Sequence, residues 1–120
     1  MPSLFGELLA ELVGDIPGAL GAVFIDWEGE AVDQFSHIPV MDILLVGAHW
    51  GVVLRQVREL LLKHGWGEPQ VLLLNGQERE ILIKPIAGEY CVVLAMRSGT
   101  HIATALESLN RVCAKIQREM

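Results

Sequence analysis

The sequence has few basic residues, few aromatic residues and only two cysteines. Nine lysines and arginines stand against fifteen aspartates and glutamates, so the 120-residue chain carries a formal net charge of −6. This charge has the wrong sign for binding a phosphate backbone, and we expect no nucleic-acid partner. Charged residues make up 20% of the chain and hydrophobic residues 52%. This composition excludes intrinsic disorder and leaves more apolar surface than a small domain can bury, which predicts an interface.

Motifs typical of catalytic, metal and nucleotide sites are also missing. There is no C-x-x-C, no H-E-x-x-H and neither of the phosphate-binding patterns G-x-x-x-x-G-K-[ST] and G-x-G-x-x-G. The four histidines are scattered without metal-ligand spacing, so we expect no enzyme, no metal and no cofactor. Cys91 and Cys113 are predicted to be buried thiols, with a disulfide or metal pair as the alternative. Asp26 and Glu28 flank a predicted turn, where they are expected to stabilise the backbone.

A long apolar run and a targeting segment are lacking too. The longest candidate for a membrane span, from Ile38 to Leu54, contains Asp42 and His49. It is shorter than the roughly 20 apolar residues that a span needs. The first residues carry no basic group of the kind that begins a secretory signal. We therefore expect no membrane insertion, a cytoplasmic location and a single domain over residues 1–120.

Apolar periodicity predicts helices and strands in the order αββαβββα. The first helix is predicted to begin after Ser3 and to end near Gly14. The other helices are predicted at about 40–64 and 102–116, and the strands at 19–26, 30–35, 70–74, 78–86 and 89–96. Asn75 and Gly76 predict a tight type I′ hairpin turn, and residues 97–100 a loop that caps the last helix. The short connections predict an α+β fold, a five-stranded antiparallel sheet with helices on both faces.

The middle helix is apolar on all sides in its first half. At about 100° per residue, its core face is predicted to carry Ile43, Val46, Trp50, Leu54, Val57 and Leu61. The opposite face carries Leu44, Leu45, Ala48 and Val52. A helix that is apolar all round is buried all round, which predicts that another chain covers this second face. Gly47 and Gly51 form a G-x-x-x-G pattern, which predicts close packing against a partner helix or on the domain's own sheet.

The pattern of the whole chain resembles the roadblock/dynein-light-chain domain family, of the type that regulates small GTPases in bacteria. The element order carries the resemblance, together with Leu12-Val13-x-x-Ile16-Pro17-Gly18-x-x-Gly21-Ala22-Val23-x-x-Asp26-x-x-Gly29 and the strand Cys91-Val92-Val93-Leu94-Ala95. It implies a roadblock/profilin-like fold with the uncharged third strand at a sheet edge, where two copies pair. The homodimer contact that it implies consists of Leu44, Leu45, Ala48, Val52, Val71, Leu72, Leu73 and Leu74.

The resemblance also implies a function without catalysis. Members of this family are platforms that, in bacteria and archaea, associate with small Ras-like GTPases and can stimulate hydrolysis. The chain is therefore expected to be a homodimeric regulator or scaffold with such a GTPase as its partner. Two alternatives stay open: a structural adaptor that assembles a larger complex without a GTPase, and a small ligand-sensing domain with a pocket.

A few side chains are weaker candidates for partner binding. Trp27 lies at a predicted hairpin tip, where it either packs on the first helix or serves as an exposed anchor. His49 lies at the border between the polar and apolar faces of the middle helix, where a contact with a partner, an exposed position and a packed one are all open. Arg55 and Arg58 follow on the same helix, as an arginine finger or as ordinary surface charges, with Arg55 able to pair with Glu59.

Overall fold

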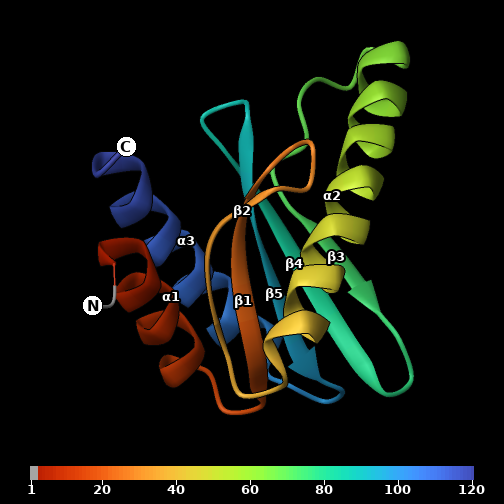
Figure 1. Ribbon diagram of the computed structural model, residues 1–120. Helices are drawn as coiled ribbons and strands as arrows, with labels where there is room; N and C mark the ends of the chain where they lie inside the picture. The colour runs from red at the N-terminus through yellow and green to blue at the C-terminus, as the bar shows by residue number, and fades with distance from the viewer. Residues whose placement is uncertain (1–2) are drawn as a thin grey trace.

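The computed structural model describes residues 3–120, which form a five-stranded sheet between two layers of helices (Figure 1). The helices are α1 (Leu4–Asp15), α2 (Val40–Lys63) and α3 (Ile102–Arg118). The strands are β1 (Ala19–Asp26), β2 (Ala31–Ser36), β3 (Leu72–Asn75), β4 (Arg79–Ile86) and β5 (Tyr90–Arg97). The predicted α+β fold and its element order are confirmed, and the predicted element bounds differ from the observed ones by two residues or fewer.

The strands lie in the order β2-β1-β5-β4-β3, and every neighbouring pair is antiparallel. The central strands β1 and β5 are almost continuously apolar because helices cover both of their faces. β3 is an edge strand, as the resemblance implies, and β2 is the other edge. β2 carries Asp33, whose carboxylate accepts hydrogen bonds from Ser3 Oγ and from the backbone N–H of Gln34.

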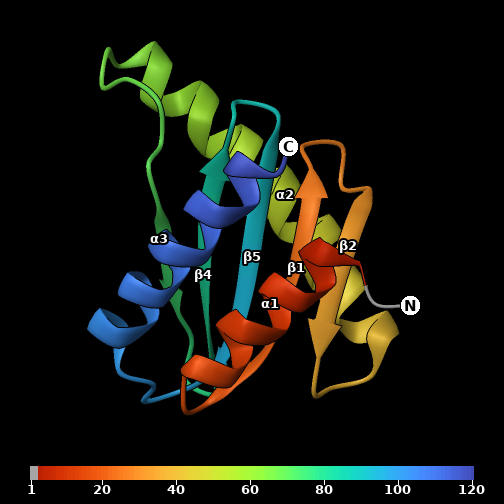
Figure 2. The ribbon, with the colours of Figure 1, turned by 90° about the vertical axis from the view of Figure 1, so that its left-hand side faces the viewer.

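Helices α1 and α3 cover one face of the sheet (Figure 2). The predicted apolar stripe of α3 is confirmed, because its inward residues are buried in the core on this face: Ala105, Leu109, Val112, Cys113 and Ile116. Two ion pairs join the helices at the surface, Arg111 with Asp15 (2.6 Å) and Lys115 with Glu11 (2.8 Å). The two helices therefore form one layer.

Helix α3 begins at a histidine cap, one residue beyond the predicted capping loop 97–100. The Nδ1 atom of His101 accepts a hydrogen bond from the backbone N–H of Thr104 (3.3 Å). Histidine is not among the preferred N-cap residues, and an aspartate at this position also interacts favourably with the helix dipole. We expect His101→Asp to raise the free energy of unfolding by about 0.5–1 kcal/mol in urea denaturation. His101→Ala should lower it, and equal stability of all three proteins would contradict a capping role.

The connection between β3 and β4 differs from the predicted turn. Asn75 lies within β3, opposite Glu80, and the N–H of Gly76 donates to the carbonyl of Arg79 (2.9 Å). Residues 77–78 therefore form the tip of the hairpin, and neither Asn75 nor Gly76 has the positive φ that a type I′ turn requires. With its amide turned toward Glu80, Asn75 donates to Oε1 of that buried carboxylate (3.3 Å). This contact favours extending the β3–β4 pairing to Asn75 and Glu80. The prediction of a type I′ turn at Asn75 and Gly76 is therefore wrong.

Helix α2 covers the opposite face of the sheet, over β1, β2 and β5. The residues of α2 that are buried there are Ile43, Gly47, Gly51 and Leu54. A Cβ atom at Gly47 would lie 2.8 Å from Cγ1 of Val23, and one at Gly51 would lie 2.9 Å from Cδ1 of Ile25. Both glycines therefore let α2 lie close against β1. This confirms packing on the domain's own sheet and rules out the partner-helix interpretation of the G-x-x-x-G pattern.

The sheet-facing side of α2 is rotated from the predicted one. The predicted core residues Ile43 and Leu54 are buried, whereas Val46, Trp50, Val57 and Leu61 are only half-buried. The rotation follows from the glycines, because the helix approaches the sheet most closely on the side that lacks side chains. The flank that carries Val46 and Trp50 is thereby left partly open.

The apolar run from Ile38 to Leu54 is by itself too short to span a membrane. Helix α2, which contains most of this run, is longer and extends to Lys63. Among residues 3–120 it is the one helix that could cross a membrane by length and composition alone. Core helices of domains in water meet the same test. Its residues Ile43 and Leu54 pack on the sheet, and 22% of its most apolar stretch is buried.

Candidate functional site

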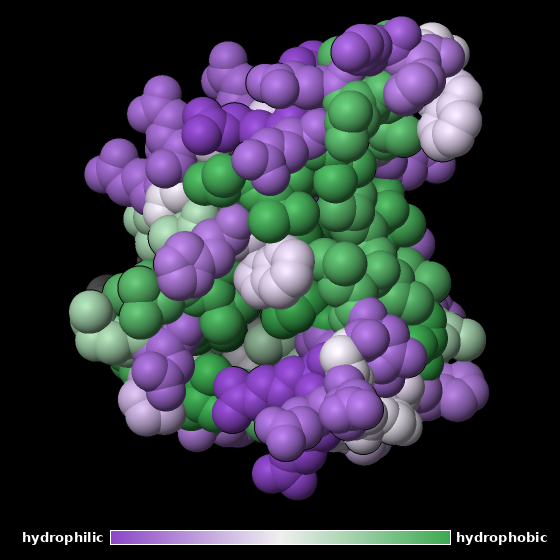
Figure 3. Space-filling model, turned by 90° about the vertical axis from the view of Figure 1, so that its right-hand side faces the viewer, coloured by the Kyte–Doolittle hydropathy of each residue, from purple (hydrophilic) through white to green (hydrophobic). Residues whose placement is uncertain are grey.

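The side of the molecule that carries α2 and β3 exposes a broad apolar surface (Figure 3). Its exposed residues on α2 and just after it are Val40, Met41, Leu45, Val52, Leu60, Leu62 and Trp66. Val71 and Leu73 are exposed at the sheet edge beside it, on the face away from α2. Met41, Leu60 and Trp66 have exposed fractions of 67%, 57% and 76%. Monomeric proteins rarely expose large contiguous apolar patches, and such patches mark sites of interaction. This surface is the candidate functional site.

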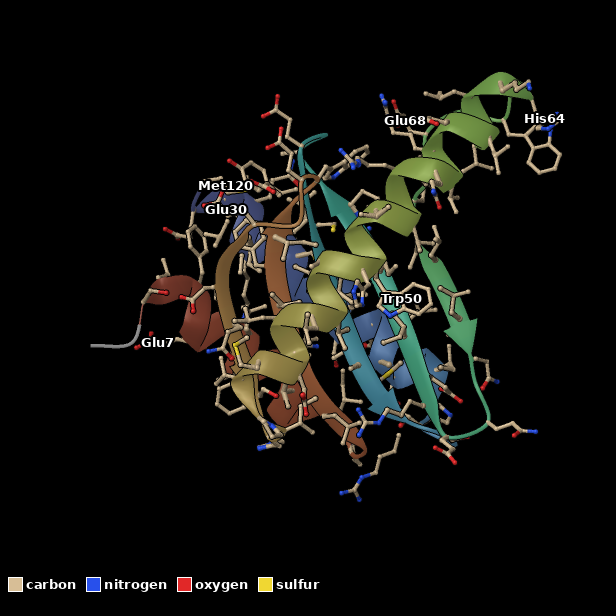
Figure 4. All side chains as sticks on the ribbon, turned by 45° about the vertical axis from the view of Figure 1, so that its right-hand side comes forward. Glu7, Glu30, Trp50, His64, Glu68 and Met120 are labelled. Atoms are coloured by element: carbon tan, nitrogen blue, oxygen red, sulfur yellow. The ribbon has the colours of Figure 1, made fainter. Side chains whose placement is uncertain are left out.

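An open groove of about 410 Å³ separates α2 from the strands β3 and β4. Its lining is Val46, Trp50, Leu74, Asn75, Gly76, Arg79 and Ile81. Trp50 extends from α2 toward these strands (Figure 4). The groove exists because α2 packs over β1, β2 and β5 and leaves the β3 side of this face less covered. Its largely apolar walls suit the side chains of another protein.

The four helix residues predicted to contact a second copy lie on two sides of α2. Leu45 and Val52 point away from the sheet and are exposed. Ala48 is half-buried against the β1–β2 turn, where a Cβ atom at Gly29 would lie 3.3 Å from the Cα atom of Ala48. Leu44 lies one turn earlier on the same flank and is also half-buried. The helix part of the predicted contact is therefore divided, with two of its members facing away from β3.

The strand residues of the predicted contact alternate between the two faces of the edge. Leu72 and Leu74 are half-buried on the α2 face. Leu73 pairs with Leu82 on the opposite face and is exposed, as is Val71 just before the strand. β3 carries no charged residue, so an uncharged edge lies beside the groove. Their contact with a second copy stays a prediction.

Trp27 is held on the α2 side of the sheet. Its indole Nε1 donates to the carbonyl of Tyr90 (3.0 Å), and the guanidinium of Arg58 lies 5.2 Å from the centre of its ring. Arg58 also forms a bidentate ion pair with Glu68, with N–O distances of 2.7 and 2.6 Å. The shared hydrogen bonds raise the pKa of Arg58 and lower the pKa of Glu68. The predicted packing of Trp27 on the first helix is wrong, and Arg58 is engaged within its own chain.

The other candidates for partner binding, His49, Arg55 and Glu59, are exposed on α2. The three ion pairs of residues 3–120 do not include the predicted pair of Arg55 with Glu59. Helical spacing places His49 and Glu59 on the side away from the sheet and Arg55 on the flank that carries Leu44 and Ala48. These side chains are accessible to a partner, and their role stays a prediction.

Asp26 has the predicted backbone role. Its Oδ1 atom accepts hydrogen bonds from the N–H groups of Glu28 (3.0 Å) and Glu30 (2.9 Å), which shape the β1–β2 turn. Glu28 and Glu30 contribute only their backbones to these bonds. The carboxylate of Asp26 is thus committed to local structure.

The two cysteines are free and buried, as predicted. Cys91 lies in the core beneath α2 and Cys113 in the core beneath α1 and α3, so the disulfide alternative is wrong. Burial raises the pKa of each thiol to about 12, which leaves both protonated and poorly nucleophilic at neutral pH. Within residues 3–120, no three His, Cys, Asp or Glu side chains are grouped to hold a metal ion.

Solved structures with this architecture are roadblock/LC7 domains and related proteins. A roadblock/LC7 domain from Streptomyces avermitilis has a TM-score of 0.87 and 11% identity, over 94% of each chain. The gliding protein MglB from Thermus thermophilus has a TM-score of 0.83 and 15% identity, over 95% of this chain and 86% of its own. MglC from Myxococcus xanthus has a TM-score of 0.72 and 21% identity, over 97% and 98%.

No protein-family model and no curated protein matches the sequence. The similarity to known proteins is therefore one of fold, and it extends over nearly the whole chain. The chain has the roadblock/LC7 fold, which is the fold that its sequence pattern resembles.

Proposed function

We propose that the chain is a non-catalytic, homodimeric regulator or scaffold that binds a small Ras-like GTPase in the cytoplasm. The observation that carries the proposal is the exposed apolar surface of α2 and β3 on a roadblock/LC7 fold. A fold alone does not define a function, so the argument depends on what this surface can bind.

Dimerisation through β3 accounts for the open side of the sheet. A second copy paired antiparallel along the uncharged edge extends the sheet and brings a second α2 beside the groove. Leu72 and Leu74, now half-buried, then become covered. The same patch serves on both copies, as a two-fold symmetric contact requires.

The GTPase is proposed to bind the outward side of α2. Glu59 lies there among exposed apolar residues and Arg55 on the adjoining flank, and they supply the polar rim that is typical of transient interfaces. Arg58 is held by Trp27 and Glu68, which argues against its insertion into a catalytic site. Regulation is therefore proposed to work by ordering the mobile switch segments of the GTPase.

We expect the chain to bind a Ras-like GTPase of its own organism at least about tenfold more tightly in one nucleotide state than in the other. Such a difference is a coupling typical of regulators. Calorimetry with the GTPase loaded with GDP or with a GTP analogue measures both affinities. Glu59→Lys should weaken binding, whereas Glu107→Lys, an exposed change on α3 at the opposite face, should not. Equal affinity in both states would instead indicate a structural adaptor, and absence of binding in both would contradict the proposal.

A further inference from the structure

A second apolar pocket lies on the α1 and α3 face of the sheet, beside the start of α1 and the end of α3. Its volume is about 420 Å³, and its lining is Phe5, Phe24, Val32, Tyr90, Glu119 and Met120. The ring centre of Phe24, which is buried, lies 5.3 Å from that of Phe5 and 5.4 Å from that of Tyr90. Val32 and Met120 are exposed. This aromatic pocket is therefore open to a partner.

A bulge in β2 turns Val32 toward the aromatic pocket. Phe24 pairs with Asp33, and the next residue of β1, Ile25, pairs with Ala31, so Val32 has no partner on β1. An extra residue of this kind interrupts the alternation of side chains along a strand and redirects one of them. Val32 thereby lies beside Phe24 on the α1 face of the sheet. Bulges are common next to functional sites for this reason.

An acidic pocket adjoins the aromatic one. It has a volume of about 410 Å³, lies between the β1–β2 and β4–β5 turns, and shares Tyr90 with the aromatic pocket. Both turns lie at the same end of the molecule as the C-terminal end of α3 (Figure 1). Glu28 and Glu89 line the acidic pocket, and Glu119 lines the aromatic one. All three are exposed, and none belongs to the three ion pairs of residues 3–120.

The cations near this end of the molecule leave these carboxylates available. Arg58 lies over Trp27, which lines the acidic pocket, but its guanidinium is bound to Glu68. Arg118 lines a different hollow, between α1 and α3. The whole chain carries a net charge of −6. A surface that is rich in one charge attracts segments of the opposite charge.

We propose that the two pockets together bind a basic segment of another protein. This segment places a large apolar side chain in the aromatic pocket and lysine or arginine side chains against Glu28, Glu89 and Glu119. An apolar anchor inside a polar rim is the usual anatomy of an interface. The site uses no residue of the contacts proposed for the GTPase or for a second copy. A scaffold of this shape can therefore hold the basic segment together with those partners.

A synthetic peptide tests the charge and the apolar anchor separately. The probe is a short fluorescein-labelled peptide with a central pair of leucines and lysines on both sides, and fluorescence anisotropy at low salt measures its binding. Replacing the lysines with glutamates should weaken binding about tenfold or more, and so should replacing the leucines with serines. Equal affinity for the lysine and glutamate peptides, or no measurable binding of the lysine peptide, would overturn the proposal.

Charge reversal on the protein locates the basic side chains. The double variant Glu28→Lys with Glu89→Lys exchanges two attractions for repulsions and should bind the lysine peptide about tenfold more weakly. It should also bind the glutamate peptide more tightly than the parent does. Glu78→Lys with Glu107→Lys makes the same change of charge at exposed positions outside the pockets and should alter affinity less than about twofold. Equal losses in the two double variants would overturn the proposed site.

A neutral substitution locates the apolar anchor. Val32→Asn should weaken binding of the lysine peptide about fivefold, because the anchor loses an apolar contact. Leu62→Asn is the matched control, since Leu62 on α2 has an exposed fraction of 44% against 46% for Val32. A loss in Leu62→Asn but not in Val32→Asn would place the peptide on α2 and overturn the proposal. Circular dichroism verifies that each variant is folded, and none of these outcomes alters the test of the GTPase contact.

Discussion

Val52→Glu is expected to make the chain monomeric at low micromolar concentration. Val52 has an exposed fraction of 41%, so a carboxylate there leaves the packing of α2 on the sheet intact. Val52 belongs to the predicted contact between two copies, so the proposed dimer would bury the two introduced carboxylates against apolar surface. Unpaired charges buried in an interface cost several kcal/mol, which corresponds to a rise of about 100-fold or more in the dissociation constant. Analytical ultracentrifugation measures the change.

The matched control for this variant is Glu59→Lys. Glu59 is exposed on the same side of the helix, two turns further on, in the charged second half of α2. The Glu59→Lys protein should remain dimeric under the conditions that dissociate Val52→Glu. A Val52→Glu protein that is dimeric at low micromolar concentration would show that this face of α2 is not the contact between copies.

Gly47→Leu is expected to lower the free energy of unfolding by about 2–3 kcal/mol, a large part of the stability of a small domain. Even a Cβ atom at this position would lie 2.8 Å from Cγ1 of Val23 and 3.1 Å from Cγ2 of Ile25. Both neighbours are fully buried and β-branched, so neither can turn aside. The higher helix propensity of leucine offsets only about 1 kcal/mol. Denaturant unfolding, followed by circular dichroism at one protein concentration, measures the loss.

The matched control is Gly14→Leu. Gly14 also lies in a helix, but a Cβ atom there meets no atom within 4 Å. Leucine should therefore be neutral or slightly stabilising at this position because of its helix propensity. If Gly47→Leu were as stable as the parent, the close contact between α2 and β1 would not exist in solution.

The fold was predictable from the sequence because the spacing of apolar residues differs between its strands and its helices. The strand 19–26 is a continuous apolar run, as expected for a central strand covered on both faces, and its predicted bounds are those observed. The stripe of α3 repeats with the helical period and is buried as predicted. The β3–β4 turn was missed because Asn75 joins the ladder opposite a buried glutamate. Such a pairing depends on a neighbouring strand and is invisible in the local sequence.

The candidate site was only partly predictable. The apolar excess and the uncharged segment 71–74 indicated an interaction surface, and the structure places both on the same side of the molecule. The orientation of α2 was missed because glycine contributes little to an apolar face, although Gly47 and Gly51 mark the side that lies closest to the sheet. The contact of Arg58 with Trp27 joins residues 31 positions apart, and no periodic pattern encodes it.

The unlike ends of the sheet have a consequence for how large an assembly can grow. The β3 end carries no charge, whereas the β2 end carries the Asp33 carboxylate, held by Ser3 and Gln34. A charged side chain on an outer strand discourages further strands from adding. In the proposed homodimer the neutral ends are joined and the charged ends remain outside, so association would stop at a closed pair instead of continuing into a fibre.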